Sequence, residues 1–184
     1  MIKRFFDIIF SLVAIILWSP ILLVCWLLAS MDTASNGLFL QMRIGQFGQP
    51  FTIYKLRTMH ASTQEISAIG AFLRRFKLDE LPQLVNVLQG SMSIVGPRPD
   101  VAGYYDLLEG KDRLILNLKP GLTSTAAIKY TNEESLLSKQ GDPLKFNDTI
   151  IFPDKVKMNL EYYYTRSFVG DLRIIWETVV VLFK

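Results

Sequence analysis

Residues 5–31 read FFDIIFSLVAIILWSPILLVCWLLASM, an apolar run of 27 residues that follows Lys3 and Arg4. About 20 apolar residues suffice for a helix to cross a bilayer, so a membrane segment is the first interpretation. A secretory signal peptide has a shorter apolar region and a small-residue cleavage site, and this run matches both poorly. The stretch therefore predicts a chain that is bound to a membrane.

Three features argue against a simple membrane span. Ser19-Pro20 lies near the middle of the run, and a proline removes a backbone donor and bends a helix. The two arms, 5–19 and 20–31, would be roughly 22 and 18 Å long, so neither crosses a hydrocarbon core of about 30 Å. Asp7 lies two residues inside the run, where a charge is tolerated only near the interface.

A helix–break–helix that enters and leaves the same leaflet accommodates all three features. It also keeps Lys3, Arg4 and the polar remainder of the chain on the cytoplasmic side, as the positive-inside rule prefers. We favour this re-entrant arrangement, broken at Ser19-Pro20, over a kinked full span with the domain outside. The expected division is a membrane segment at 1–31 and a cytoplasmic-face domain at 32–184.

The composition of the 184 residues fits one membrane-associated domain. Half of the residues are hydrophobic and the mean hydropathy is positive, which is unusual for a soluble domain. The net charge of +3 suits an anionic lipid surface or a phosphate ligand and is weak evidence for nucleic-acid binding. One cysteine, Cys25, excludes a disulfide within the chain, and one histidine, His60, leaves acid–base chemistry to carboxylates.

The rest of the chain predicts a compact, helix-rich α/β domain with a small β-hairpin. Residues 38–42 and 51–56 are short apolar or alternating runs around glycines and a proline, which is typical of a hairpin. Residues 64–77 have helical spacing and end in basic residues, so this helix either lies flat on a membrane or packs on the core. Residues 131–155 are polar and contain two prolines, and we expect mostly loop there.

The C-terminal run, residues 168–183, places apolar side chains on one side, among them Trp176 and Phe183. Charged residues such as Asp171 and Glu177 interrupt it, so it cannot span a membrane. We expect either a core helix or a second amphipathic helix at the membrane interface.

Residues 77–90 read KLDELPQLVNVLQG and place two carboxylates, Asp79 and Glu80, before a predicted helix at 80–89. One interpretation is structural, because Asp79 suits the N-cap of that helix and Glu80 suits its positive end. The other is catalytic, because a carboxylate can attack phosphorus or bind a magnesium ion that bridges phosphate oxygens.

Basic residues in separate segments favour the catalytic interpretation of the carboxylate pair. If these segments converge, they form a pocket for several phosphates. Prolines on both sides of Arg98, in Gly96-Pro97-Arg98-Pro99, fix its backbone and suit a positioned guanidinium. The candidate cations are Arg43, Lys55, Arg57, Arg74, Arg75 and Arg98.

Several unusual motifs follow one another over most of residues 1–125. They are Lys3-Arg4 with the break at Ser19-Pro20, Gln41-x-Arg43-x-Gly45, Phe51-x-Ile53-Tyr54-Lys55-x-Arg57-Thr58-Met59, Leu78-Asp79-Glu80-Leu81-Pro82-Gln83-Leu84-x-Asn86-Val87-Leu88-x-Gly90, Met92-Ser93, Gly96-Pro97-Arg98-Pro99 and Lys119-Pro120-Gly121-Leu122-Thr123. In their order and spacing, the chain resembles the small monotopic phosphoglycosyl transferases, the bacterial sugar transferase family that begins glycan assembly on a polyprenyl phosphate.

The resemblance implies a reaction in which a sugar-1-phosphate passes from a UDP-sugar to a polyprenyl phosphate, expected to be undecaprenyl phosphate, with release of UMP. It implies a ping-pong scheme that needs Mg²⁺ and a covalent phosphosugar intermediate on Asp79. Glu80 is expected to assist with the metal or with the incoming phosphate, so both carboxylates are candidate metal ligands. The product would begin a surface glycan such as an exopolysaccharide, or a glycoprotein sugar.

Five further residues receive roles by the same resemblance. Arg74 matches the basic position near the lipid phosphate. Arg98, with Pro97, matches the arginine associated with the phosphates of the nucleotide sugar. Lys55 and Arg57 are expected to support the pocket, with surface charge or strand pairing as the alternative for each.

The resemblance also favours the re-entrant helix, and therefore an active site at the cytoplasmic face of the bacterial inner membrane, in contact with membrane lipids. It allows for a homodimer. Residues 124–134 depart from the pattern of many members in a region expected to face the sugar, so the donor sugar stays open. The tyrosines at 162–164 either contact the nucleotide or pack on the core.

The sequence leaves two alternative functions open. One is a non-catalytic, membrane-anchored module that binds a phospholipid or a partner through its basic face. The other is a different magnesium enzyme, such as a membrane-bound phosphohydrolase, which needs no lipid acceptor.

Overall fold

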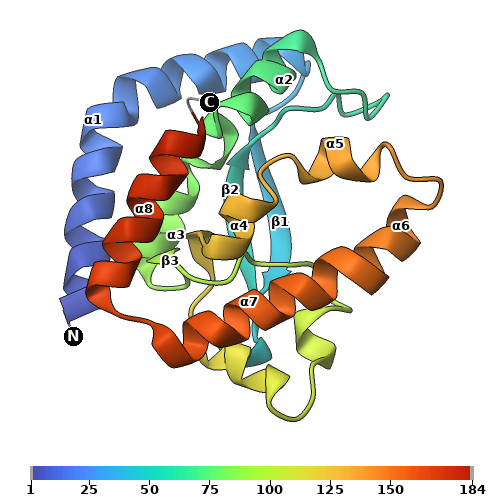
Figure 1. Cartoon of the computed structure of the whole chain (residues 1–184). Helices are drawn as coiled ribbons and strands as arrows, with labels where there is room; N and C mark the ends of the chain where they lie inside the picture. Colours follow the sequence, from blue (N-terminus) through green and yellow to red (C-terminus); the bar gives the residue numbers. More distant parts are fainter. Residues whose placement is uncertain (1, 183–184) are drawn as a thin grey trace. The chain divides into compact units, whose positions relative to one another are not determined.

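The computed structural model describes residues 2–182, and Phe183 therefore lies outside the described residues. The chain is helix-rich with short strands, as the sequence predicts (Figure 1). Two compact units interleave along it: the first contains the residues up to Arg43 and Pro50–Ile94, and the second contains Ile44–Gln49 and the residues from Val95 onward. The division into 1–31 and 32–184 refers to the membrane and stays a prediction.

The first unit begins with α1, a single helix at Ile2–Asp32 that contains Pro20. Figure 1 shows α1 changing direction between its two limbs. Pro20 has no N–H to donate to the carbonyl of Ile16, and the Ser19 hydroxyl donates to that oxygen instead, at 2.9 Å. The expected break at Ser19-Pro20 is thus a position inside one bent helix, and re-entry into the membrane stays a prediction.

The two faces of α1 reverse the pattern of a core helix. Large apolar side chains such as Leu17 are exposed, whereas the buried residues are small or polar: Asp7, Ser11, Cys25 and Ala29. Within residues 2–182, α1 alone is long and apolar enough to cross a membrane. A long helix with its apolar side chains directed outward indicates that the chain associates with a membrane.

The rest of the first unit packs a hairpin against two short helices. The predicted hairpin is confirmed as β1 (Leu38–Ile44) and β2 (Pro50–Leu56), joined by a 3₁₀ turn at Gln46–Gly48. The predicted helices are shorter than expected, with α2 at Ala68–Arg75 and α3 at Gln83–Gln89. A core of Cys25, Ala29, Leu56 and Leu73 joins α1, β2 and α2, and β3 (Ser93–Val95) follows α3.

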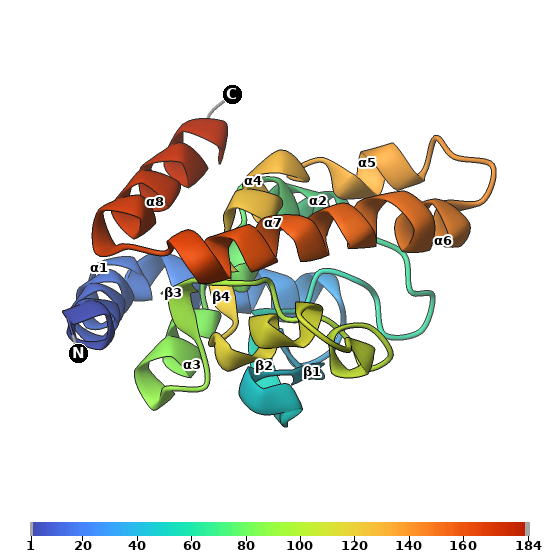
Figure 2. The ribbon, with the colours of Figure 1, turned by 60° about the horizontal axis from the view of Figure 1, so that its bottom comes forward.

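The second unit consists mainly of helices along its C-terminal half (Figure 2). Its core contains Ile44, Tyr105, Ile115, Leu116 and Val156. Its elements are 3₁₀ turns at Tyr105–Leu107 and Asp112–Asn117, β4 (Gly121–Thr123), α4 (Thr125–Lys129), α5 (Glu133–Leu137), α6 (Pro143–Phe146), a π-helical turn at Asn147–Ile151, α7 (Phe152–Thr165) and α8 (Phe168–Leu182).

The loop expected at 131–155 is wrong, because most of this segment is helical. The prolines that suggested a loop lie where a helix tolerates a missing N–H. Pro143 opens α6 behind its N-cap residue Asp142, whose side chain accepts from the Lys145 N–H at 3.0 Å. Pro153 is the second residue of α7, directly after the π-helical turn at Asn147–Ile151, where the regular i→i−4 ladder is already interrupted.

Helix α8 has a packed side, as expected of a core helix, and an exposed apolar side, while its expected place at a membrane interface stays a prediction. Asp171 and Ile174 are buried, and Asp171 accepts a hydrogen bond of 2.5 Å from the Tyr162 hydroxyl of α7. Val169 and Trp176 are exposed, at 75% and 68%. One side of α8 therefore packs on the unit, and the other presents apolar side chains outward.

Candidate active site

The carboxylate pair of the first unit lies in a tight turn between two helices. Asp79 and Glu80 belong to a 3₁₀ turn at Leu78–Glu80 and are 7% and 6% exposed. Lys77 precedes them in the left-handed conformation, with φ 54°, which is strained for a residue with a side chain. The backbone therefore turns sharply just before the pair and directs both carboxylates into a largely buried site.

The structural interpretation of Asp79 as a helix cap is wrong. The N-cap residue of α3 is Pro82, whose side chain makes no capping hydrogen bond, and the N-cap residue of the 3₁₀ turn is Lys77. The predicted helix start was three residues too early, because the 3₁₀ turn occupies Leu78–Glu80 and α3 begins only after its N-cap residue Pro82. Burying two adjacent carboxylates is costly unless they are paired and hydrogen-bonded, and buried carboxylates of this kind are candidates for a functional site.

Lys55 is one cation that the structure brings to this pair. Its Nζ lies 3.4 Å from Glu80 Oε1, and both side chains are largely buried. Lys55 is on β2, whose neighbour in space is α3. The amide of Asn86 joins the two elements, donating to the Thr52 carbonyl at 2.7 Å and accepting from the Tyr54 N–H at 3.1 Å.

Arg74 and Arg57, two further candidate cations of the first unit, differ in role. Arg74 lies in the last turn of α2, and its carbonyl accepts from the Lys77 N–H at 3.1 Å, just before the carboxylate turn. Arg57 donates through Nε to the Asn36 carbonyl at 3.1 Å and lies over the Phe39 ring. These contacts fit the structural alternative for Arg57 and leave its expected part in a pocket a prediction.

Pro97 and Arg98 belong to the second unit, where main-chain contacts fix their loop. Gly121 N–H donates to the Pro97 carbonyl at 2.8 Å, and Gly96 N–H donates to the Thr123 carbonyl at 3.0 Å. A Cβ on Gly121 would lie 2.1 Å from the Gly96 nitrogen, so these two backbones touch only because both residues are glycine.

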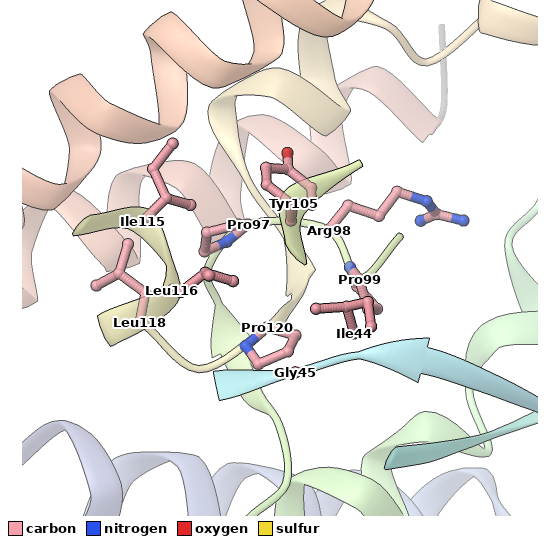
Figure 3. A pocket seen from close by; sticks show the side chains of 10 residues that line it. All are labelled: Ile44, Gly45, Pro97, Arg98, Pro99, Tyr105, Ile115, Leu116, Leu118 and Pro120. Carbon is pink, nitrogen blue, oxygen red and sulfur yellow. The ribbon is translucent and has the colours of Figure 1, made fainter. Parts of the chain in front are cut away.

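Residues of this loop line a small pocket (Figure 3). Its lining is apolar apart from Arg98 and the Tyr105 hydroxyl, and in Figure 3 the Arg98 guanidinium extends away from the prolines and leucines. The Tyr105 hydroxyl accepts from the buried Asn159 amide at 2.8 Å, and burial raises the pKa of Tyr105. The lining residues are Ile44, Gly45, Pro97, Arg98, Pro99, Tyr105, Ile115, Leu116, Leu118 and Pro120.

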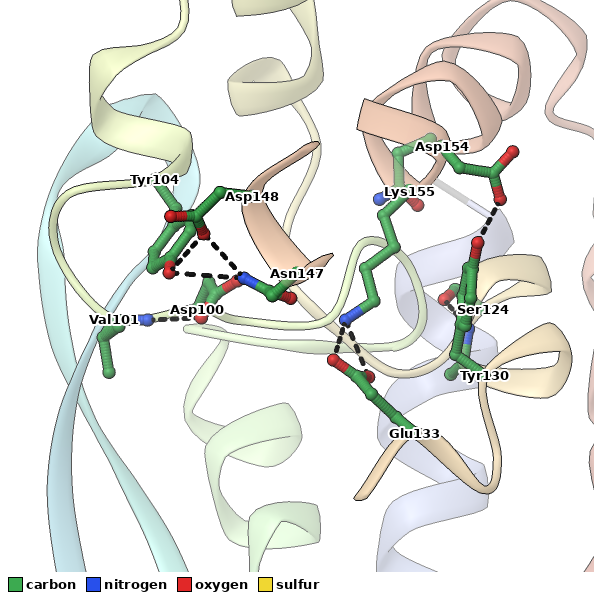
Figure 4. A network of polar contacts seen from close by, with 12 residues as sticks. Asp100, Val101, Tyr104, Ser124, Tyr130, Glu133, Asn147, Asp148, Asp154 and Lys155 are labelled. Atoms are coloured by element: carbon green, nitrogen blue, oxygen red, sulfur yellow. Dashed lines mark hydrogen bonds and ion pairs between the residues drawn. The ribbon is translucent and has the colours of Figure 1, made fainter. Parts of the chain in front are cut away.

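Residues 124–134, which depart from the family pattern, are bonded to α7 (Figure 4). Lys155 donates to both oxygens of Glu133 at 2.7 Å. The Tyr130 hydroxyl donates to Asp154 at 2.7 Å, and Lys129 forms an ion pair with the same carboxylate. Hydrogen bonds from Lys129 and Tyr130 lower the pKa of Asp154, and burial followed by the bond to Asp154 raises that of Tyr130 to about 12.

Within residues 2–182, no group of three or more His, Cys, Asp or Glu side chains is arranged to bind a metal. Magnesium, however, commonly binds through one or two carboxylates, waters and the phosphates of a substrate. The adjacent carboxylates Asp79 and Glu80 therefore fit a metal that is shared with a phosphate ligand.

Sequence reasoning missed three of the residues that shape these sites: Lys77, Asn86 and Tyr105. Asn86 had a visible signal, since it is a polar residue among the apolar positions of a short helix. Lys77 had none, because lysine rarely adopts a positive φ.

Comparison with known proteins places the chain in a family. A sequence profile described as bacterial sugar transferase matches residues 1–184. The chain is 34% identical to the UDP-glucose:undecaprenyl-phosphate glucose-1-phosphate transferase of Escherichia coli, over 97% of this chain and 39% of that protein. It is 28% identical to the UDP-N-acetylgalactosamine-undecaprenyl-phosphate N-acetylgalactosaminephosphotransferase of Aeromonas hydrophila, over 100% and 42% respectively.

An exopolysaccharide production protein of Rhizobium meliloti is 29% identical, over 97% of this chain and 84% of that protein. The chain thus spans about two-fifths of the length of the first two relatives and most of the third. Since the profile covers every residue, the chain belongs to the bacterial sugar transferase family.

Proposed function

We propose that this chain transfers a sugar-1-phosphate from a UDP-sugar to undecaprenyl phosphate, giving undecaprenyl-diphosphate-sugar and UMP. The observation that carries the proposal is the buried pair Asp79 and Glu80, with Lys55 3.4 Å from Glu80. The names of the Escherichia coli and Aeromonas hydrophila relatives describe this class of reaction with two different sugars. That agreement supports the general reaction and leaves the sugar open.

The proposed reaction has two steps on one phosphorus atom. In the first, an Asp79 carboxylate oxygen attacks the phosphorus that carries the sugar, the bond from this phosphorus to the bridging oxygen breaks, and UMP leaves with that oxygen. In the second, an oxygen of the lipid phosphate attacks the same phosphorus. The bond to Asp79 breaks, which regenerates the carboxylate and releases the lipid diphosphate sugar.

The neighbouring residues have roles that follow from their charge and position. Glu80 and Asp79 would bind Mg²⁺, which neutralises charge on the phosphate oxygens when it is bound. Lys55 keeps the Glu80 carboxylate oriented. Arg74, at the end of α2, and Arg98, with its backbone fixed beside Pro97, are proposed to contact the lipid phosphate and the nucleotide-sugar phosphates respectively.

Membrane attachment through α1 suits this chemistry. We propose that α1 re-enters the leaflet with its bend at Ser19-Pro20 and leaves the active site at the cytoplasmic face of the bacterial inner membrane. The long polyprenyl chain then never leaves the bilayer, because the nucleophile lies at headgroup depth. The lipid diphosphate sugar would be the starting unit for the assembly of exopolysaccharide or another surface glycan, in line with the name of the Rhizobium meliloti relative.

The test is UMP release by the full chain in lipid nanodiscs, with Mg²⁺ and a panel of UDP-sugars, with and without undecaprenyl phosphate. For one donor we expect release that depends on the lipid, and its loss in Asp79→Asn. Glu109→Gln, which neutralises an exposed carboxylate, is the matched control and should retain activity. Removing the metal with a chelator should stop turnover in the wild type.

Other outcomes identify the rival functions. UMP release that is equal without lipid indicates a phosphohydrolase. Lipid binding that falls with salt, that Asp79→Asn leaves unchanged and that accompanies no release from any donor indicates a non-catalytic binding module.

A further inference from the structure

Two charged residues near the start of α1 contact the protein rather than the solvent. Arg4 donates to the carbonyls of Val87 and Leu88, at 2.5 and 2.9 Å. Asp7, which is 2% exposed, accepts from the Ser93 hydroxyl at 2.8 Å and from the Ile94 N–H at 3.1 Å. The sequence assigned Arg4 to the positive-inside rule and Asp7 to the membrane interface, so these contacts give both residues another explanation.

The contacts of Arg4 complete the C-terminal end of α3. The last four carbonyls of a helix have no partner within it, and a cation there also complements the helix dipole. Because the planar guanidinium donates to two carbonyls at once, it fixes the position of α1 along α3 more closely than a point charge would. Figure 2 shows this end of α1 beside α3 and β3.

The contacts of Asp7 fix the next segment of the chain. A buried carboxylate is strongly destabilising when its partners are lost, so its bonds to Ser93 and Ile94 determine where β3 begins relative to α1. Arg4 and Asp7 are three residues apart and lie on one face of α1. They bind both ends of the connection that runs from α3 to β3.

Helix α3 links this connection to the candidate nucleophile. Asp79 and Glu80 end a 3₁₀ turn, and α3 starts three residues later at Gln83. The position of α3 on α1 therefore sets the position of the carboxylates relative to the helix that associates with the membrane. Large apolar side chains cover the outer face of α1, so its depth in the membrane is set independently of α3.

We propose that Arg4 and Asp7 are positioning residues that fix the register between the membrane helix α1 and the segment carrying Asp79 and Glu80. This inference rests on the proposed function, because the register matters most for an acceptor that is held in the bilayer. A soluble UDP-sugar diffuses to the carboxylates at any position relative to the membrane. A lipid phosphate is held at a fixed depth and reaches only carboxylates that lie at that depth.

The test compares the two steps of the reaction in nanodiscs. Arg4→Lys keeps the positive charge and loses the pair of hydrogen bonds to the Val87 and Leu88 carbonyls. Asp7→Asn keeps the shape of the side chain and loses its negative charge. Both should lower lipid-dependent turnover about tenfold, since small misplacements of reacting groups are costly. The burst of UMP from donor alone should stay close to that of wild type. Lys3→Gln is the control, because it removes a neighbouring charge and leaves the Arg4 contacts intact.

Two results would overturn the proposal. If Arg4→Lys matches wild type while Arg4→Gln is impaired, the residue acts through its charge on membrane orientation. If burst and turnover fall together in every variant, the contacts serve general stability and not the register.

Hydrogen exchange of the full chain separates this inference from the proposed function. The Ile94 amide should exchange about tenfold faster in Asp7→Ala, and the amides that follow Leu88 should exchange faster in Arg4→Lys. Unchanged exchange in both variants rules out the positioning contacts. Faster exchange in a protein that releases no UMP rejects the proposed reaction and leaves the contacts in place.

Discussion

The two units fix their candidate charged residues by different means. In the first unit the contacts are made by side chains: the Asn86 amide forms hydrogen bonds that join α3 to β2, and Lys55 forms an ion pair with Glu80. In the second unit the contacts are made by the main chain, with Gly96 and Gly121 in backbone contact beside the loop of Arg98. The first arrangement is sensitive to the polarity of a side chain, and the second is sensitive to the addition of a single carbon atom.

The largest effect is expected from Gly121→Ala. The new Cβ would lie 2.1 Å from the Gly96 nitrogen, and a backbone atom cannot move aside as a side chain can. We expect a loss of about 3 kcal/mol in the free energy of unfolding, measured by urea denaturation, together with lost UMP release. Gly141→Ala is the control, since a Cβ there meets nothing within 4 Å. Equal stability of the two variants would show that the glycine contact does not fix the loop.

Asn86→Ala should have the next largest effect. It leaves the Tyr54 N–H and the Thr52 carbonyl without their partner in a site where Asn86 itself is 1% exposed. Losing two buried hydrogen bonds should cost about 2 kcal/mol of stability. Gln89→Ala, on the exposed side of the same helix, should be close to neutral. If the two variants have the same free energy of unfolding, the hydrogen bonds of Asn86 do not stabilise the first unit.

The sequence predicted those elements whose structure depends on local patterns, that is, on hydrophobic periodicity and on turn residues. The apolar run of α1 and the hairpin of β1 and β2 are visible in hydrophobic periodicity and turn residues alone. The prediction of a loop at 131–155 failed because Pro143 and Pro153 were treated as helix breakers, although Pro143 opens α6 and Pro153 follows a π-helical turn inside the helical run. Position within the first turn depends on where the helix starts, which periodicity locates least well.

The candidate site shows the same limit. The sequence shows Asp79 and Glu80 as an acidic pair, but their burial in a 3₁₀ turn follows the left-handed Lys77, for which the sequence offers no signal. The Gly96–Gly121 contact joins residues 25 positions apart, and each glycine alone suggests only a turn. Tertiary contacts of this kind cannot be inferred from local spacing.

Lys55 and Glu80 test whether the ion pair of the first unit contributes energy. A double-mutant cycle with Lys55→Met and Glu80→Gln should give a coupling free energy of about 1 kcal/mol, more than a typical exposed pair because both side chains are largely buried. Stability by urea denaturation is the measurement. The exposed pair Arg173 and Glu177 on α8 is the control and should show less coupling. Equal coupling in the two pairs would remove the distinction between them.

Tyr130 gives the smallest effect, and it tests a side-chain hydrogen bond in the second unit, apart from the backbone contacts that fix the loop of Arg98. Burial and the hydrogen bond to Asp154 raise the pKa of Tyr130 from 10 to about 12, so the fold favours the neutral hydroxyl. Its contribution, about 1 kcal/mol for one such bond, is complete below about pH 10 and is lost as the pH rises through about 12. Tyr130→Phe should therefore be less stable than wild type at about pH 9 in urea denaturation, and the difference should shrink at about pH 12. Tyr164→Phe, at an exposed position, should match wild type at both values. A constant difference for Tyr130→Phe across this range would mean that the ring packing, and not the hydroxyl, joins this segment to α7.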